Sequence, residues 1–248
     1  CLRKGAFGSK GFLSRALKTN KTILEVDLSD NRQLGDVHAE DLAEVLAANT
    51  SLKKVVCDMA SIKSVGFGAL AGALKTNSTL EELSVRGNWL GGLSLPCDGQ
   101  QGARSASLWD ILALALVEEG LAASISLKRL HLDQCEINAS MVSAIAQGLE
   151  ANNSLVELTM SCNYRIGDDG AALLAKGIAS NTSLQKLDMN FCGIAKLGAT
   201  SLAEALRTNT VLEELDLGRN FAIGFDGADA FGRVLASHTS LKSLNLVD

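Results

Sequence analysis

The stretch Leu212–Asn220, which reads LEELDLGRN, decides the fold of this chain. It has leucine at its first, fourth and sixth positions and asparagine at its ninth. The same spacing begins again at Ile23, Leu52, Leu80, Leu127, Leu155, Leu184 and Leu241. By subtraction, successive starts are 29, 28, 47, 28, 29, 28 and 29 residues apart. A repeat of nearly constant length in this range predicts a solenoid, in which one structural unit is stacked on the next.

A second pattern precedes each start and keeps the same phase. Apolar residues stand ten and six residues before the start, and a four-residue spacing places the two on one face of a helix. These pairs are Leu13/Leu17, Leu42/Leu46, Leu70/Leu74, Val117/Leu121, Ile145/Leu149, Leu174/Ile178, Leu202/Leu206 and Phe231/Leu235. Three residues before the start stand Asn20, Asn49, Asn77, Asn152, Asn181 and Asn209, with Ser124 and His238 in the other two repeats. Asparagine tolerates the left-handed conformation that ends a helix, so each repeat is predicted to be a strand, a turn, a helix and a second turn.

The ninth position divides the repeats into two types. Asparagine stands there at Asn31, Asn88, Asn163 and Asn220, and a small residue at Ala60, Cys135 and Cys192. This alternation resembles the ribonuclease-inhibitor class of leucine-rich repeats, which tropomodulins, Ran GTPase-activating proteins and NOD-like receptors share. The resemblance implies an α/β horseshoe solenoid of about eight repeats of 28 or 29 residues, with a parallel sheet on the concave face and helices on the convex face. It also implies a ladder of buried asparagines that bond to the backbone of the neighbouring coil.

We interpret residues 1–248 as a single solenoid, and as part of a longer chain because neither end carries a polar cap. One step of 47 residues exceeds the usual 28 by 19 (47 − 28), which places a loop insertion at about 91–108. The insertion is rich in glycine and serine and holds the only proline, Pro96. The helix after it, beginning near Trp109, is unusually apolar. It either lies under its own loop or contacts another protein, and in the second case Pro96 and Trp109 bind the partner.

The concave face is expected to carry template positions two, three, five, seven and eight. Strands of the asparagine type hold acids there, such as Glu82, Glu157 and Glu214, whereas the alternate strands hold bases, such as Lys54 and Lys186. Opposite charges should therefore lie side by side on neighbouring strands. A face neutralised in this way argues mildly against a strongly basic partner. A net charge of −5 argues against nucleic acid.

Large planar side chains follow the ninth position of the asparagine-type repeats. They are Arg32, Trp89, Tyr164 and Phe221, with Arg165 and Arg219 beside them. The alternate repeats carry Ser61, Glu136 and Gly193 at the same place. Each ring either covers its neighbouring loop or, as we hypothesise, lies on a rim that contacts a protein partner. Interface hot spots are enriched in tryptophan, tyrosine and arginine.

No group of residues supports catalysis. His131 is expected beside Ser84 and Thr159, but Asp133, two residues along the strand, would be about 6.6 Å away and would have to lean back to meet the imidazole. A metal site made from His131, Asp133 and Cys162 matches no ligand spacing. We therefore predict no enzymatic activity, no cofactor and no metal.

The cysteines indicate a reducing compartment. None of the six forms a C-x-x-C pair, and Cys57, Cys135 and Cys192 fall on inward positions, so we expect an intracellular and most simply cytoplasmic protein. No apolar stretch approaches the roughly 20 residues that span a membrane, and no signal peptide is visible.

The sequence therefore predicts a protein–protein interaction module, acting as a scaffold or as a structural subunit of a large intracellular complex. Two alternatives remain open. One is an enzyme regulator, of the GTPase-activating or the nuclease-inhibitor type, and the other is an actin-capping protein.

Overall fold

The computed structural model describes residues 11–91 and 108–247, with Trp109 described in its backbone alone. Pro96 and nearly all of the predicted insertion lie outside these residues. The helices are α1 (Phe12–Thr19), α2 (Gly35–Ala48), α3 (Ser64–Ala73), α4 (Leu108–Ala123), α5 (Ala139–Ala151), α6 (Gly167–Ser180), α7 (Lys196–Ala205) and α8 (Gly224–Leu235). The strands are β1 (Glu25–Asp27), β2 (Lys54–Val56), β3 (Glu82–Ser84), β4 (Arg129–His131), β5 (Glu157–Thr159), β6 (Lys186–Asp188), β7 (Glu214–Asp216) and β8 (Ser243–Asn245).

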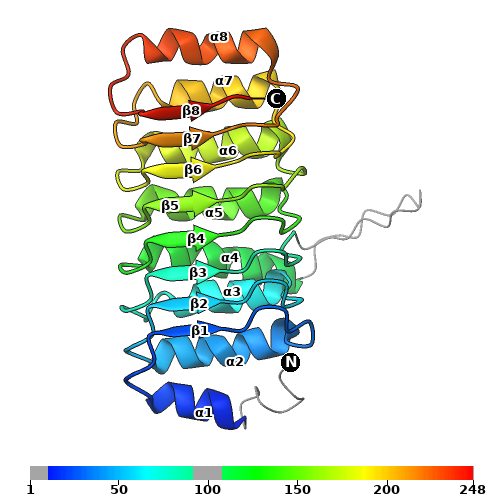
Figure 1. Cartoon of the computed structure of the whole chain (residues 1–248), viewed down its shortest axis with the longest axis vertical. Helices are drawn as coiled ribbons and strands as arrows, with labels where there is room; N and C mark the ends of the chain where they lie inside the picture. Colours follow the sequence, from blue (N-terminus) through cyan, green and yellow to red (C-terminus); the bar gives the residue numbers. More distant parts are fainter. Residues whose placement is uncertain (1–10, 92–107, 248) are drawn as a thin grey trace, which may run out of the picture.

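The strands form one parallel sheet in the order β1 to β8, and the helices cover one of its two sides (Figure 1). Strand and helix alternate in every repeat of the described residues, which confirms the α/β leucine-rich-repeat solenoid. We call the uncovered side of the sheet the sheet face. The sheet register is continuous, because each strand pairs residue for residue with the next.

The middle residues of the strands form one row directed toward the helices. The row is Val26, Val55, Leu83, Leu130, Leu158, Leu187, Leu215 and Leu244. From Val55 to Leu215 these side chains are at most 2% exposed, and they share one core with helix leucines such as Leu42 and Leu174. The repeats are therefore held together by stacked leucines, as the period predicts.

The ninth-position asparagines bond to the preceding repeat. Asn163 donates from Nδ2 to the carbonyl oxygen of Leu132 at 2.9 Å, and its Oδ1 accepts from the backbone amides of Cys135 and Ile137 at 2.9 and 3.0 Å. Asn88 and Asn220 make the same contacts in their own repeats. Each amide thus satisfies backbone groups that would otherwise be buried without a partner, which confirms the predicted ladder.

The asparagines that follow the helices work differently from our expectation. Asn152 has φ −77° and ψ 132°, which is extended and not left-handed, so the predicted conformation is wrong. It ends α5 through its side chain: Oδ1 accepts from the amides of Ser154 and Leu155, while Nδ2 donates to the carbonyl oxygen of Leu121 in the preceding repeat. These residues therefore form a second ladder. Left-handed residues stand instead at the eighth position of each repeat, from Asp30 with φ 59° to Arg219 with φ 56°, and also at the tenth position of the alternate repeats, as at Glu136 with φ 55°.

His238 takes the place of asparagine in the last of these turns. Its Nδ1 accepts from the amide of Leu241 at 3.2 Å, and its Nε2 lies 3.0 Å from the carbonyl oxygen of Asn209. A neutral imidazole that is protonated at Nε2 reproduces the one acceptor and one donor of the amide.

Glycine allows two neighbouring helices to touch. A Cβ atom on Gly120, in the last part of α4, would lie 2.0 Å from the carbonyl oxygen of Ala71 in α3. At this contact the backbones of α3 and α4 pack directly against each other, which a side chain at position 120 would prevent.

Candidate functional site

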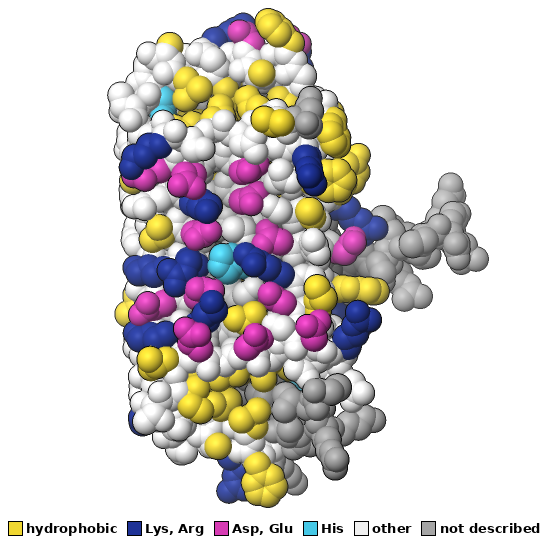
Figure 2. Space-filling model, viewed as in Figure 1, with side chains coloured by type: hydrophobic (Ala, Val, Ile, Leu, Met, Phe, Trp, Pro, Cys, Tyr) yellow, Lys and Arg dark blue, Asp and Glu magenta, His cyan; other side chains and the backbone are white. Residues whose placement is uncertain are grey.

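The strongest candidate surface is the edge of the solenoid where the chain leaves each strand, which we call the rim. At the eighth position the backbone is left-handed in each repeat from Asp30 to Arg219, and the tenth residue follows two positions later. Trp89, Tyr164 and Phe221 occupy this tenth position, and they are 66%, 69% and 64% exposed. Each of these side chains therefore keeps most of its surface open to solvent. Figure 2 shows hydrophobic side chains gathered along this edge of the sheet face.

Phe191 joins two of these rings into a continuous surface. Its ring centroid lies 6.0 Å from that of Tyr164 and 6.4 Å from that of Phe221, where the rings meet edge to face. Phe191 stands at the eighth position of the repeat between them and is 38% exposed. We call Tyr164, Phe191 and Phe221 the aromatic row. The sequence-based hypothesis named two of its members and missed Phe191.

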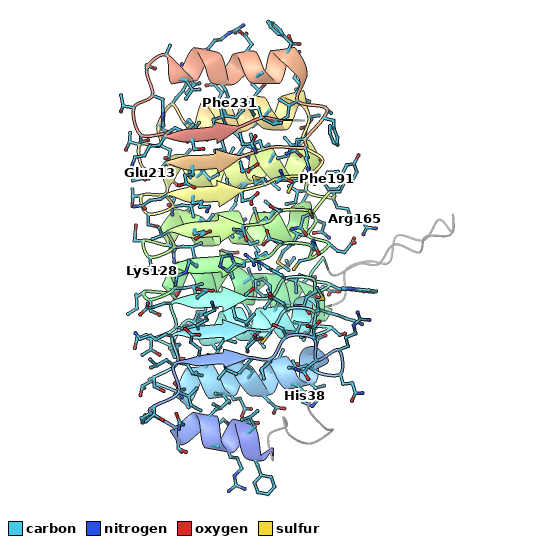
Figure 3. All side chains as sticks on the ribbon, in the orientation of Figure 1. His38, Lys128, Arg165, Phe191, Glu213 and Phe231 are labelled. Atoms are coloured by element: carbon cyan, nitrogen blue, oxygen red, sulfur yellow. The ribbon has the colours of Figure 1, made fainter. Side chains whose placement is uncertain are left out.

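The two arginines of the hypothesis lie beside the aromatic row. Arg165 is directed to the same edge as Phe191 (Figure 3), and its Nε lies 3.7 Å from Oε2 of Glu136. Arg219 is exposed and stands in the left-handed eighth position with φ 56°. The aromatic row is therefore flanked by two arginines, of which Arg165 is paired with Glu136.

The other end of the rim is hollowed. An open depression of about 550 Å³ is lined by Arg32, Met59, Ser61, Lys63 and Trp89, with Gly87 and Gln134. We call it the cationic hollow. Ser61 is the small tenth residue between Arg32 and Trp89, and Gly87 leaves a gap at the eighth position next to Met59.

Glycine suits position 87, although the other described repeats hold residues with side chains at the same place and with a similar positive φ. The φ of Gly87 is +65°, a conformation that side chains disfavour, and an added Cβ would lie 3.0 Å from Cγ of Met59. A larger residue there would press on the wall of the hollow.

The apolar helix after the insertion is α4. Leu108, Ile111 and Leu112 are 79%, 54% and 50% exposed, whereas Ala113 and Val117 are buried. The described part of its first turns thus presents apolar side chains at the surface. Pro96 and the side chain of Trp109 lie outside the described residues, so their predicted contact with a partner stays a prediction.

The sheet face is electrically balanced. Glu82 lies between two bases, with 2.9 Å to Nζ of Lys54 and 2.9 Å to Nε of Arg129. Lys186 likewise lies between Glu157 at 3.4 Å and Glu214 at 3.7 Å. Acidic and basic side chains interleave over the middle of this face (Figure 2). Most of these groups are open to water, so each pair contributes at most about 1 kcal/mol to stability.

His131 lies at the centre of a polar cluster and not in a catalytic triad. Its Nδ1 is 3.1 Å from Nη2 of Arg86, a group that can only donate, so the imidazole is neutral with its proton on Nε2. Asp133 pairs with Arg86 at 2.7 Å and accepts from the hydroxyl of Thr159 at 2.7 Å. Ser84 donates to Asp58 and not to His131. Burial, and after it the charge of Arg86, lowers the pKa of His131.

A metal site or a membrane-spanning helix would each show a recognisable pattern in residues 11–91 and 108–247. Within them, no group of three or more His, Cys, Asp or Glu side chains is arranged to hold a metal ion. None of the helices described here has both the length and the apolar composition that crossing a bilayer demands.

Comparisons with known proteins agree with this architecture. The family model of the Leucine Rich repeat matches residues 19–43, 76–95, 151–175, 180–203 and 208–232. "Ribonuclease inhibitor" of Mus musculus is 26% identical over 186 residues, which are 73% of this chain and 36% of that protein. "NACHT, LRR and PYD domains-containing protein 12" of Mus musculus is 30% identical over 191 residues, which are 75% of this chain and 16% of that protein. The chain thus spans less than half the length of either relative.

The chain is also similar to a solved structure. The tropomodulin C-terminal domain of Caenorhabditis elegans is 15% identical, with a TM-score of 0.45 over 90% of this chain and 96% of that chain.

Proposed function

This chain belongs to the leucine-rich-repeat proteins of the ribonuclease-inhibitor-like class, and from that premise we propose that it is a protein-binding module within a larger assembly. One observation carries the proposal: the exposed rings of Tyr164, Phe191 and Phe221 pack into one row at the edge of the sheet. Aromatic side chains that already pack against one another lose little conformational entropy on binding, which makes such residues effective anchors.

The proposed contact surface runs along the whole rim. It consists of Arg32, Trp89, Tyr164, Arg165, Arg219 and Phe221 from the sequence, with Phe191 added from the structure and with Pro96 and Trp109 retained as predicted neighbours. The sheet face has a lesser part, because its acids and bases already bind one another. The module acts as a scaffold or structural subunit, and binds protein rather than nucleic acid.

A double substitution on the rim tests this function. The partner is first captured from the native source and identified, and its affinity for Trp89→Ala/Tyr164→Ala is then compared with that for the parent chain. Both side chains are about two thirds exposed, so the variant should fold normally. Loss of two anchors is expected to weaken binding by about 2 kcal/mol or more, which is roughly thirtyfold.

Ile125→Ala is the matched control. Ile125 is an exposed apolar residue, 73% exposed, in the turn between α4 and β4, at the opposite edge of the sheet. It should leave the affinity unchanged. If the folded Trp89→Ala/Tyr164→Ala variant also keeps full affinity, the rim is not the contact surface.

We place the protein inside the cell, most simply in the cytoplasm. All four cysteines in the described ranges are free thiols, and three of them, Cys57, Cys135 and Cys192, are buried. Unpaired, packed thiols suit a reducing compartment.

A nuclease-inhibitor function is the second candidate, favoured by the similarity to proteins named ribonuclease inhibitor. The pairing of Glu82 with Lys54 and Arg129 argues against it, because the acid is already neutralised. An assay of ribonuclease activity with and without the chain decides the matter, and we expect no inhibition. Assays of GTPase stimulation and of actin-filament elongation test the remaining alternatives in the same way.

A further inference from the structure

The cationic hollow and the aromatic row are built on equivalent positions of different repeats. Each uses the tenth position of one repeat, the eighth of the next and the tenth of the third. These three positions hold Tyr164, Phe191 and Phe221 in the aromatic row, and Arg32, Met59 and Trp89 in the hollow. The same scaffold therefore presents two different surfaces along one rim.

Side-chain size decides which of the two is closed. In the aromatic row, Phe191 lies within 6.4 Å of both flanking rings and fills the space between them. In the hollow, the unbranched side chain of Met59 stands in its place, and Ser61 and Gly87 leave the remaining volume of about 550 Å³ open. The hollow is thus large enough for one or two side chains of a partner.

The hollow also carries positive charge that the described part of the chain does not neutralise. Arg32 and Lys63 are both exposed, and neither makes an ion pair with a described residue. On the sheet face, by contrast, Lys53 and Lys54 each have a carboxylate within 2.9 Å. The nearby carboxylate of Asp36 accepts from the backbone amides of Lys63 and Gly66 through one oxygen, Oδ1.

We propose that the cationic hollow binds an acidic segment of a protein partner, in which a carboxylate stands next to an apolar side chain. The carboxylate lies between Arg32 and Lys63, and the apolar side chain packs on the indole of Trp89 and the thioether of Met59. This inference rests on the proposed function, because it assigns the chemistry of one end of the rim. A polyanion such as nucleic acid fits poorly, since the chain carries a net charge of −5.

Binding at this site can be followed through the indole N–H signal of Trp89 in an NMR spectrum. The chain has two tryptophans, so the indole region of a 15N correlation spectrum holds two signals, and Trp89→Phe assigns one of them. The probe is a capped peptide of alternating glutamate and leucine, and the control peptide has glutamine in place of glutamate. The acidic peptide should shift the Trp89 signal in a saturable way, at least about tenfold more tightly than the glutamine peptide, and less tightly as salt is raised.

A matched pair of variants locates the charge. Arg32→Gln/Lys63→Gln removes the two exposed cations and should abolish the tenfold preference without affecting the fold. Arg207→Gln removes an exposed arginine that is already paired with Glu204 at 2.7 Å, after α7, and should leave the preference intact.

Three outcomes overturn the proposal: no saturable shift of Trp89 with the acidic peptide, equal shifts with both peptides, or an undiminished preference in Arg32→Gln/Lys63→Gln. These outcomes leave the proposed function standing if Trp89→Ala/Tyr164→Ala still weakens the native partner. A different result separates the two proposals. If the peptide binds as expected but the native partner binds the Trp89→Ala/Tyr164→Ala variant with unchanged affinity, the hollow is an acidic-peptide site and the proposed function of the rim fails.

Discussion

The rings of Tyr164 and Phe191 lie with their centroids 6.0 Å apart and their planes inclined by 43°, although they come from successive repeats. Phe191 contacts Phe221 as well, at 6.4 Å and 77°. One side chain therefore connects two others that the repeat length would leave apart. The three rings therefore already pack against one another in the chain without a partner.

Phe191→Ala should weaken partner binding while the chain stays folded. The change removes two ring contacts worth about 0.5–1.5 kcal/mol each and leaves Tyr164 and Phe221 free to move. We expect isothermal titration with the identified partner to show a loss of about tenfold. Phe12→Ala, which removes an 87% exposed ring from α1, is the control and should have no effect. If the affinity of Phe191→Ala for the partner is unchanged, the contacts of Phe191 within the aromatic row do not contribute to binding.

Asn163→Ala should destabilise the chain by about 3 kcal/mol, because it leaves the buried amides of Cys135 and Ile137 without an acceptor. Urea denaturation followed by circular dichroism measures the change. Asn153→Ala, at an exposed asparagine in the turn between α5 and β5, should shift the free energy of unfolding by less than about 0.5 kcal/mol. Equal effects of the two substitutions would contradict the ladder.

Gly120→Ala should destabilise the chain although alanine is the better helix former. The added Cβ would lie 2.0 Å from the carbonyl oxygen of Ala71, so α3 and α4 must separate, at a cost of about 1–3 kcal/mol. Gly232→Ala in α8 is the matched control, because no atom lies within 4 Å of its added Cβ. There we expect a gain of up to about 1 kcal/mol. Opposite signs for the two melting-temperature shifts are the result that supports this packing.

The stability of the chain should depend on His131 near neutral pH. Burial, with help from the charge of Arg86, lowers the pKa of His131 from its usual 6.5. Between the lowered pKa and 6.5, the unfolded chain binds more protons than the folded chain, so the free energy of unfolding rises with pH over this window. Above pH 6.5 the unfolded histidine is neutral as well, and the free energy of unfolding no longer changes with pH because of His131. His131→Gln should flatten this slope in denaturation series between about pH 5 and about pH 8.

Carboxylates act in a separate, lower window. Burial tends to raise the pKa of Glu82, but hydrogen bonds from Lys54 and Arg129 outweigh it and hold the pKa below the usual 4.5. The stability from Glu82 is therefore lost only as the pH falls below about 4.5. The two windows can therefore be told apart. If His131→Gln does not change how the free energy of unfolding varies with pH above about 4.5, the imidazole is not the group that titrates there.

One thiol of the described residues should react quickly with a disulfide reagent. Cys162 is exposed, whereas burial raises the pKa of the Cys135 and Cys192 thiols to about 12 and also raises that of Cys57. In a variant with Cys1→Ser and Cys97→Ser, the folded chain should release one equivalent of chromophore quickly and four after denaturation. A second fast thiol would show that the core opens readily.

The period of the leucines was enough to predict each repeat, because a leucine at the wrong spacing would face water. The resemblance to ribonuclease-inhibitor repeats predicted the bonds of Asn163, since a buried amide has the backbone of the neighbouring coil as its available partner. The period did not predict the extended backbone of Asn152, because a side chain that bonds the turn removes the need for a left-handed residue.

Phe191 and the hollow needed coordinates. The eighth position holds Asp30, Met59 and Gly87 in other repeats, so the column has no shared chemistry that marks it as a site. The volume beside Trp89 depends on the sizes of neighbours from three different repeats. The curvature of the horseshoe stays a prediction.

The most direct measurement is hydrogen-exchange footprinting of the chain with and without its identified partner. Our account predicts protection of the turns after β3, β5, β6 and β7, which carry Trp89, Tyr164, Phe191 and Phe221, with no protection in the middle of α2, α5 and α6. Protection confined to those helices, on the side away from the sheet, would contradict it.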